Sequence, residues 1–465
     1  MNYRDLFVGL DVQVPLLDGR QVTYVNLDNA ASTPSLRHVA DCVQNFLGYY
    51  SSVHRGMGFK SQVSTHAYEQ ARLATLQFVG ADPRDHICIF GKNATEAINR
   101  LSRRFPFTDD KNIILVSMME HHSNDLPWRA VGRVVHVHLT PDGCLDEEDF
   151  DKKLARHAGR IAMVAISGAS NVTGYVNPIH RLAEKAHKAG AQIMVDCAQL
   201  APHRQIRMLP LDDPAHLDYV AISAHKMYAP FGTGALIGRR DLFEQGAPDL
   251  RGGGEVEIVT VDDVVWSEPP ERDEAGSPNT VGAVALGAAI AQLEAIGMQA
   301  VANHEAELTR YALEQFAQVP NLRMFGCPDP EKTANRLGVI PVVMEGLSHY
   351  LVAAILGYEY GIGVRNGCFC AHPYLLNLLG VSEDRAGWVR SSILSHDRRE
   401  VPGLVRISFG LYNEKEDVDV LVSALLDIQK GKYKGKYSQD VRSGAFQPEG
   451  WDIRFEDYFR FSVSQ

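Results

Sequence analysis

The chain has 465 residues, of which 45% are hydrophobic and 22% are charged, a composition typical of a globular protein with a sizeable core. This excludes a disordered or fibrous protein. The 46 Lys and Arg against 57 Asp and Glu give a formal net charge of -11, which repels phosphate backbones and anionic lipid headgroups. We therefore expect no nucleic acid as a partner.

Nothing in the sequence predicts export or membrane insertion. Residues 1–20 carry charges throughout, without the basic start and continuous apolar stretch of a secretory signal. No run of about 20 apolar residues, the length that spans a bilayer, occurs in the chain. The 7 cysteines are an odd number scattered along a long chain, which indicates reduced thiols. We expect a cytoplasmic protein with no membrane partner.

The first half of the chain alternates short β-branched runs with helical patterns, which is typical of a mostly parallel sheet covered by helices on both faces. The expected strands are residues 86–90, 112–116, 134–139, 161–167, 192–195, 219–223 and 235–237. The expected helices between them include residues 67–79, 94–105 and 179–188. The sequence therefore predicts an α/β fold.

A second, smaller α+β domain is predicted after residue 303. There the pattern changes to a long amphipathic stretch, a loop rich in Pro, Gly and Asn, and then strand and helix signals as far as Ile428. Residues 381–402 are charged and weakly patterned, so we expect them to form an excursion between two elements of this domain.

The clearest chemical signal is the run DYVAISAHKMYAPFGTGALIG at residues 218–238. It predicts a buried strand, a polar turn that contains Ser223, His225 and Lys226, and a Gly-rich return into another strand. Open α/β sheets bind ligands at such strand ends, and burial there lowers the pKa of a lysine toward that of a reactive amine. Lys226 is a Schiff-base candidate, although an isolated loop lysine is usually only solvated.

Asp196 ends the apolar run AQIMVD and is followed by Cys197, Ala198 and Gln199. An acid at this position can simply cap the next helix. Together with a reactive lysine, it is also what pyridoxal 5'-phosphate needs, because a carboxylate keeps the pyridine nitrogen of that cofactor protonated. The pair of Lys226 and Asp196 therefore suggests pyridoxal phosphate as a cofactor.

Two further polar turns follow predicted strands. In residues 91–96 (GKNATE), free amides and the Thr95 hydroxyl at a helix N-terminus would bind a phosphate group, or the turn is a plain helix cap. In residues 120–124 (EHHSN), a flat imidazole could stack on a cofactor ring or move protons, and a structural histidine is an equal alternative. Metal ligation is less favoured there, because no matching acid and histidine set follows at ligand spacing.

The ordered motifs of the chain resemble those of class V aminotransferase-fold enzymes, and most closely the group II cysteine desulfurases and selenocysteine lyases. They cover about residues 20–428 and read NLDNAASTP, SSVHRGMG, ATEAIN, MEHHSNDLPW, SNVTGYVNP, VDCAQ, SAHKMYAPFGTG, RGGGE, EAGSPNT, GVRNGCFCAHP and VRISFGLYN. The resemblance implies the pyridoxal-phosphate transferase fold of type I, with an active site at a homodimer interface. It implies a large cofactor domain of residues 21–300, a small domain of residues 1–20 and 301–430, and an extension of residues 431–465.

The resemblance also implies cofactor-binding roles. Lys226 would bind the cofactor covalently and act as catalytic base, and Asp196 would face the pyridine nitrogen. Gln199 would donate to the phenolic oxygen of the ring, and the His121 imidazole would stack on the ring. The matching phosphate ligands are Thr95, Ser223 and His225, with Thr280 supplied by the partner subunit.

On the substrate side, the resemblance assigns Asn171, Arg365, Arg406 and Cys370. A guanidinium suits a carboxylate because it forms two parallel hydrogen bonds, so Arg406 would hold the substrate carboxylate. Cys370 would be the nucleophile that forms a persulfide, and Arg365, which lies just before it, would favour the thiolate. The implied reaction releases sulfur from L-cysteine, or from a related thio- or seleno-amino acid, with alanine as product and with a sulfur-acceptor protein as a possible partner.

Two other functions stay open. One is a pyridoxal-phosphate-dependent C–S or C–Se lyase, or another class V reaction, that does not require Cys370. The other is a non-catalytic binding protein that has kept the fold, against which the intact pair of Lys226 and Asp196 argues.

The sequence departs from the family pattern at several positions. Ala94 stands where a hydroxyl residue often accompanies Thr95, and Gly168 stands where many relatives have histidine. In Cys368-Phe369-Cys370, residues two apart on an extended chain face the same side, so Cys368 could resolve a persulfide, form a strained disulfide, or do neither. With His372 the run could hold part of a metal site, but no fourth ligand is evident, so we expect no metal.

The C-terminal segment is expected to be a linker followed by a docking segment. Residues 431–437 (GKYKGKY) form the linker. Residues 438–465 should pack against the body of the dimer or a dedicated partner, because their aromatic side chains would otherwise leave a large apolar surface in water: Trp451, Phe455, Tyr458, Phe459 and Phe461. The alternative is a disordered tail.

Overall fold

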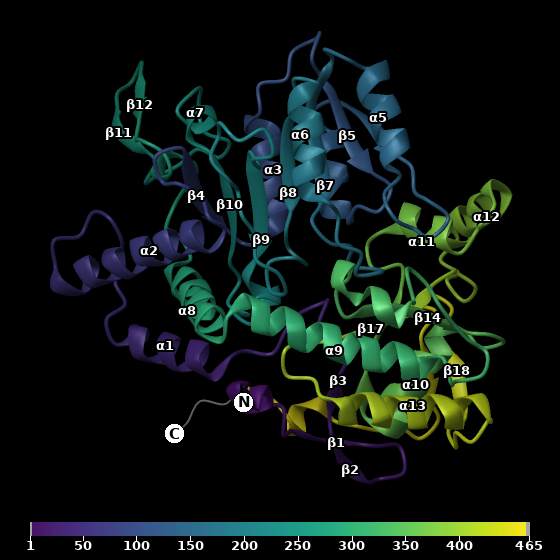
Figure 1. Ribbon diagram of the computed structural model, residues 1–465. Helices are drawn as coiled ribbons and strands as arrows, with labels where there is room; N and C mark the ends of the chain where they lie inside the picture. The colour runs from purple at the N-terminus through teal and green to yellow at the C-terminus, as the bar shows by residue number, and fades with distance from the viewer. Residues whose placement is uncertain (1, 462–465) are drawn as a thin grey trace.

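A seven-stranded sheet forms the centre of the larger lobe in the computed structural model, which describes residues 2–461 (Figure 1). Its strand order is β4-β10-β9-β8-β7-β5-β6, and only β10 runs against its neighbours. This confirms the predicted α/β fold with a mostly parallel sheet. The strands are β4 (His86–Gly91), β5 (Ile113–Ser117), β6 (Arg133–Val137), β7 (Ile161–Ser167), β8 (Gln192–Asp196), β9 (Tyr219–Ser223) and β10 (Gly234–Arg239).

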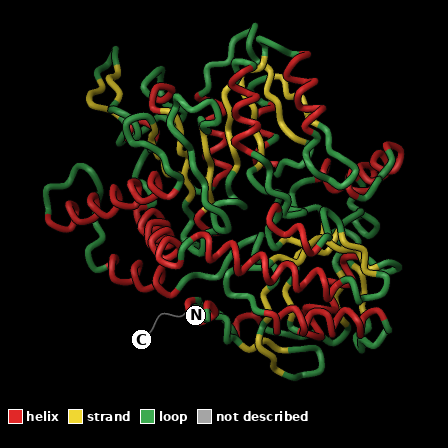
Figure 2. The backbone as a smooth tube through the Cα atoms, in the orientation of Figure 1, coloured by secondary structure: helices red, strands yellow, loops and turns green. Residues whose placement is uncertain are grey.

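Helices cover both faces of this sheet, as Figure 2 shows by its red layers around the yellow strands. The lobe contains α1 (Arg37–Leu47), α2 (Phe59–Phe78), α3 (Ala94–Arg104), α4 (Leu126–Arg129), α5 (Glu147–Arg156), α6 (Ile179–Lys188), α7 (Arg240–Phe243) and α8 (Thr280–Ile296), with a hairpin of β11 (Val256–Val259) and β12 (Val264–Trp266). Alternate residues of β4 enter different cores, because successive side chains of a strand point to opposite faces. Ile87 and Ile89 pack with α3, whereas Cys88 and Phe90 pack with α2 and α8.

Each of the seven expected strands is present, and the expected helix at residues 67–79 is longer than predicted. It begins eight residues earlier, as α2 (Phe59–Phe78). Only Ser61 and Ser64 are buried in its first turns, so the hydrophobic periodicity that predicts a helix is weak there.

The smaller lobe is built on a four-stranded antiparallel sheet in the order β13-β14-β17-β16. Its elements are β13 (Leu322–Met324), β14 (Val339–Met344), β16 (Arg365–Gly367), β17 (Leu404–Ser408), α9 (Met298–Phe316), α10 (His349–Tyr360), α11 (His372–Leu378), α12 (Glu383–Leu394) and α13 (Lys415–Gln429). The chain start contributes β1 (Gln13–Pro15), β2 (Gln21–Thr23) and β3 (Val25–Asn26), which pairs with β15 (Ile362–Gly363). Val25 and Leu27 pack in the core of this lobe, although both follow residue 21 in the sequence. The domain boundary at residue 21 stays a prediction.

The expected excursion at residues 381–402 lies between α11 and β17 and contains α12. Of the side chains of α12, only Val389 is buried. A helix with so narrow a buried face leaves almost no periodic signal in its sequence, which explains why the segment looked weakly patterned.

The first part of the C-terminal segment packs against the smaller lobe. It forms a hairpin of β18 (Tyr437–Gln439) and β19 (Phe446–Pro448), and the ring of Trp451 meets that of Tyr358 edge-on at 4.9 Å. Further along, Phe455, Tyr458, Phe459 and Phe461 are exposed, so their predicted docking on a dimer or partner stays a prediction. Residues 462–465 of the predicted docking segment lie outside the described residues.

Within residues 2–461, no single helix combines the length and the apolar character needed to cross a bilayer. Only α8 and α9 taken together pass on length and composition, and they are bent by 76° where they meet.

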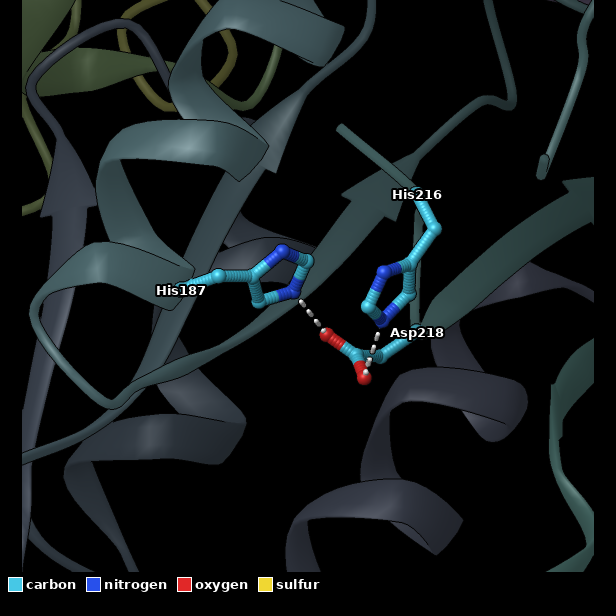
Figure 3. Close-up of side chains that lie close together, drawn as sticks. All are labelled: His187, His216 and Asp218. Carbon is cyan, nitrogen blue, oxygen red and sulfur yellow. Dashed lines mark hydrogen bonds and ion pairs between the residues drawn. The ribbon is translucent and has the colours of Figure 1, made fainter. Parts of the chain in front are cut away.

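Asp218 ties together several segments at the edge of the sheet where β9 begins (Figure 3). Its carboxylate accepts hydrogen bonds from the Ile193 backbone N–H at 2.8 Å, His187 Nε2 at 2.9 Å and His216 Nε2 at 3.3 Å. Burial opposes the charge, but the two histidines hold the pKa of Asp218 well below its usual range. The bond to Asp218 in turn raises the pKa of His187 against the effect of burial.

The same three side chains have the composition of a metal site, but their arrangement suits a charge cluster better. The two imidazole rings are stacked at 4.1 Å with planes only 18° apart (Figure 3). A ligated metal ion lies along the lone pair of each ring nitrogen, in the ring plane, and rings stacked in this way cannot both meet that condition. Arg239 also contacts the Asp218 carboxylate, at 3.3 Å.

We predict that Asp218→Asn lowers the free energy of unfolding by about 3 kcal/mol, because it removes the negative charge from a buried ion-pair cluster. The pKa of His187 is raised in the folded protein, so its ion pair with Asp218 contributes its whole stabilisation below the pKa of an unfolded histidine. That stabilisation is lost as the pH rises through the pKa of His187 in the folded protein. Urea unfolding should therefore show a larger difference from the wild type at pH 6 than at pH 9. Glu184→Gln, which removes an exposed ion pair with Lys188, is the control and should leave stability unchanged. An Asp218→Asn variant as stable as the wild type would contradict this interpretation.

Candidate active site

One cavity of about 530 Å³ lies where the carboxyl ends of β7, β8 and β9 face the smaller lobe. It brings together all the predicted site residues except Thr280. They are Thr95, His121, Asn171, Asp196, Gln199, Ser223, His225, Lys226, Arg365, Cys370 and Arg406. Residues from both lobes therefore form a single site, as expected for ligands at the strand ends of an α/β sheet.

Lys226 ends the short 3-10 turn η3 (Ala224–Lys226) that follows β9, which places its amine in the cavity. Loss of water around the amine lowers its pKa to about 8, and the Arg406 charge acts in the same direction. The Asp196 and Cys370 charges oppose this shift. The result is an amine that can lose its proton near neutral pH, as the strand-end position predicted.

Asp196 and Gln199 lie on the β8 side of the cavity. The Asp196 carboxylate is buried and accepts the Ala198 N–H at 3.0 Å. Burial raises its pKa, whereas that N–H and the Lys226 charge oppose the rise. The Gln199 amide donates to the Ala30 carbonyl at 2.6 Å, a contact that the sequence did not indicate.

The N-terminus of α3 forms the polar wall expected for a phosphate group. Asn93 caps the helix through the Glu96 N–H at 3.0 Å, and the Ala94 N–H donates to Ser223 Oγ at 2.8 Å. Thr95 Oγ1 lies 2.7 Å from Ser123 Oγ. Ser123 was missed in the sequence, and it supplies a hydroxyl beside Thr95 where Ala94 has none. His225 Nδ1 lies 3.3 Å from the Ser32 hydroxyl, and burial lowers the pKa of His225 to about 4.

The His121 ring is neutral and has a defined tautomer. Burial lowers its pKa to about 3, helped by the charges of Lys226 and Arg406. Its Nδ1 accepts the Ser123 backbone N–H at 3.1 Å, so the ring proton is assigned to Nε2. A neutral flat imidazole in the cavity fits the stacking role that the resemblance implies.

Glu120, which the sequence analysis passed over, holds the His121 loop in place. Its buried carboxyl group accepts hydrogen bonds from Ser117 at 2.5 Å, Ser167 at 2.5 Å and Asn124 at 2.7 Å. These donors tie the loop to the ends of β5 and β7. Burial outweighs the three bonds and raises the pKa of Glu120 to about 7. Its position next to His121 in the EHHSN motif was the available signal.

The two arginines predicted to lie on the substrate side share one carboxylate, that of Asp28, for which no role was predicted. Asp28 accepts from Arg406 at 3.0 Å and pairs with Arg365 at 3.0 Å. Arg406 is buried and also donates to the Asn171 carbonyl at 3.0 Å, while its Nε has no hydrogen-bond partner. Arg406 therefore keeps one buried donor without a partner, while its side chain lines the cavity. Asp28 belongs to the NLDNAASTP motif, which was noticed only as part of the resemblance.

The backbone between the two thiols is not extended, which corrects the geometry assumed for Cys368, Phe369 and Cys370. Phe369 and Cys370 have φ angles of 55° and 54°, and the Ala371 N–H donates to the Cys368 carbonyl at 3.0 Å. This is a tight turn with both central residues in the left-handed region. Phe369 is buried under the Arg406 guanidinium, and both thiols still line the cavity.

Thr280 lies outside this cavity. It lines a second pocket with Tyr50, residues 51–55 and the loop at residues 276–278. In a single chain it therefore cannot contact a group bound beside Lys226, and its predicted role in a partner subunit stays a prediction.

The segment at residues 381–402 forms one wall of the cavity. Ile393, Arg398, Val401 and Pro402 line it beside the two thiols. This segment therefore borders the same space as Lys226 and the two thiols.

Comparison with known proteins identifies the family of the chain. The family profile described as Aminotransferase class-V matches residues 25–421. The chain belongs to the class V aminotransferase family. It is 34% identical to a probable cysteine desulfurase from Streptomyces coelicolor, covering 90% of this chain and 94% of that protein. A cysteine desulfurase from Serratia proteamaculans is also 34% identical, over 90% and 97% of the two chains.

Solved structures agree with this membership. The cysteine desulfurase CsdA from Escherichia coli superposes with a TM-score of 0.75 at 30% identity, covering 93% of this chain and 98% of that one. The apo cysteine desulfurase from Thermococcus onnurineus gives a TM-score of 0.76 at 30% identity, over 88% and 95% of the two chains.

We predict that Glu120→Ala lowers the free energy of unfolding by about 2–4 kcal/mol, because three buried donors lose their acceptor. The freed loop should also displace His121 and shift the absorbance of bound pyridoxal phosphate. Glu120→Gln keeps a carbonyl acceptor and should lose less stability. Denaturant unfolding and absorbance spectra measure both effects, and an Ala variant with wild-type stability would show that the network is not needed.

Proposed function

We propose that the protein is a pyridoxal-phosphate-dependent cysteine desulfurase that takes sulfur from L-cysteine, or from a related thio- or seleno-amino acid, as a persulfide on Cys370 and leaves alanine. One observation carries this proposal: the Cys370 thiol and the Lys226 amine line the same cavity, with Arg406 between the lobes. The names of the relatives with 34% identity support the same reaction.

The residues of the cavity fit pyridoxal phosphate. The Lys226 amine has a lowered pKa suited to a covalent link, and the Asp196 carboxylate is buried next to it. The hydroxyls of Thr95, Ser123 and Ser223 and the N-terminus of α3 suit a phosphate group. When bound there, the cofactor supplies an electron sink that makes the α-proton of an amino acid acidic.

Binding and proton transfer then fall to the side chains of this chain. Arg406 lines the cavity and would bind the substrate carboxylate through its guanidinium, with Arg365 nearby across Asp28. The Lys226 amine, with a pKa of about 8, takes the proton from the α-carbon and can return one during formation of alanine. His121 is neutral and carries its proton at Nε2, so it adds no positive charge that would oppose proton removal by Lys226.

Cys370 performs the sulfur transfer. Its thiolate attacks the sulfur of the substrate and forms a new S–S bond. The bond between that sulfur and the β-carbon breaks, and the carbon fragment keeps the electron pair and takes up protons to become alanine. The transferred sulfur remains on Cys370 as a persulfide, so no outside oxidant or reductant is needed.

We further propose a cytoplasmic homodimer that delivers its sulfur to an acceptor protein. The position of Thr280 in a separate pocket supports a site completed by a second copy of the chain. Exposed apolar side chains near that pocket, including Met57, Phe59, Ile258 and Val259, would be covered by such an interface.

We predict that Cys370→Ala still binds pyridoxal phosphate but loses alanine formation from L-cysteine by at least a hundredfold. The thiol is needed only to accept sulfur, so the absorbance of the cofactor should be retained. Cys42→Ala, which removes a partly buried thiol on α1 that does not line the cavity, is the control. Rapid-quench detection of alanine measures the reaction.

Full alanine formation by the Cys370→Ala protein would contradict the proposal and favour a lyase that works without a thiol. A chain that binds no pyridoxal phosphate would instead support the non-catalytic binding protein.

A further inference from the structure

Cys368 lies beside Cys370 in a turn that is fixed from outside. The Phe369 carbonyl accepts Asn171 Nδ2 at 2.8 Å, and the Cys370 carbonyl accepts the His122 N–H at 2.8 Å. Two successive residues other than glycine with positive φ cost about 1–2 kcal/mol each, and such strain persists only where the surroundings hold it. The turn keeps both thiols at the cavity wall instead of allowing one to relax away.

His372 contacts Cys368, and His122 in turn contacts His372. The Cys368 Sγ lies 3.7 Å from His372 Nδ1, which lies 3.1 Å from His122 Nε2. The backbone N–H of His372 points at the same His122 Nε2, at 3.4 Å. His122 Nε2 must therefore be the acceptor, and the proton between the two rings is assigned to His372 Nδ1.

This arrangement gives the Cys368 thiol a route to lose its proton. As His372 Nδ1 passes its proton to His122 Nε2, it can accept one from Cys368. The thiol needs such help, because burial raises the pKa of Cys368. Burial also lowers the pKa of both His122 and His372, which favours the neutral form of each ring.

We propose that Cys368 is a second sulfur-carrying thiol, which takes the sulfane sulfur from the Cys370 persulfide. This proposal rests on the proposed desulfurase function, which supplies that persulfide. Cys368 would free Cys370 for another substrate while the first sulfur stays at the cavity wall.

The transfer balances without a co-reactant. The Cys368 thiol gives its proton to His372, and the thiolate attacks the outer sulfur of the Cys370 persulfide. The S–S bond at Cys370 breaks, its electron pair stays on the Cys370 sulfur, and that sulfur takes up a proton. A new S–S bond on Cys368 holds the transferred sulfur, so no net oxidation occurs.

Two other uses of Cys368 fit the contacts less well. A disulfide with Cys370 would require attack on the inner sulfur and would discard the sulfur as sulfide, which defeats delivery to an acceptor. A metal site would need the lone pair of His122 Nε2, which already accepts from His372.

The test measures how many alanine molecules form per active site. The holoenzyme receives two equivalents of L-cysteine per site, without reductant or acceptor. The wild type should form two alanines per site, and Cys368→Ser should stop at one. Fragment-ion mass spectrometry of the alkylated peptide that holds both cysteines should place one added sulfur on each in the wild type. With one equivalent, part of the sulfur should be found on Cys368.

Two further variants sharpen the test. His372→Asn should slow the second alanine at least tenfold relative to the first in the same time course, because the thiol loses its proton acceptor. Cys42→Ala should behave as the wild type. Circular dichroism and the cofactor absorbance identify any variant that fails to fold. The position of the added sulfur on the wild-type peptide is measured without any variant.

Three outcomes would overturn the proposal. The first is a wild type that stops at one alanine with all added sulfur on Cys370. The second is a disulfide between the two cysteines with release of sulfide. The third is full alanine formation by Cys370→Ala, which would remove the proposed desulfurase mechanism as well, whereas the first two outcomes leave that mechanism intact.

Discussion

The burial of the Lys226 amine beside a carboxylate and a guanidinium is the constraint on which the rest of the site depends. A charged amine is costly to remove from water, so its pKa falls to about 8 and it becomes chemically useful near neutral pH. The sheet makes this possible, because β8 and β9 are parallel neighbours whose carboxyl ends place Asp196 and Lys226 at one edge. The smaller lobe closes the same space with Arg406 from β17.

The second constraint is the strained turn that carries the thiols. Residues from both lobes hold it: Asn171 and His122 bind its carbonyls, and Arg406 covers the Phe369 ring. The arginine proposed to bind the substrate carboxylate therefore also packs against the turn that carries the thiols. Movement of the lobes against each other would change both functions together, since neither the carboxylate site nor the thiol turn belongs to one lobe alone.

Periodicity predicted the sheet well, because strands buried on both faces are continuous apolar runs bounded by polar turns. It failed for the start of α2 and for α12, where few side chains are buried and the pattern is weak. Among the site residues, Lys226 and Asp196 could be inferred from the chemistry of strand ends. The roles of Asp28 and Glu120 were not predicted, because they depend on partners such as Arg365 and Ser167, far away in the sequence, and for Glu120 the only sequence signal was its position beside His121. The turn at Phe369 was mistaken for extended chain, since neither central residue is the glycine or asparagine that usually marks positive φ.

The central claim is that the Lys226 amine is the covalent anchor of pyridoxal phosphate. Reduction of the holoenzyme with borohydride, followed by digestion and peptide mass spectrometry, tests it most directly. The account predicts one modified lysine, Lys226, and no adduct at that peptide in Lys226→Ala. Attachment of the cofactor to another lysine in the wild type would contradict the account.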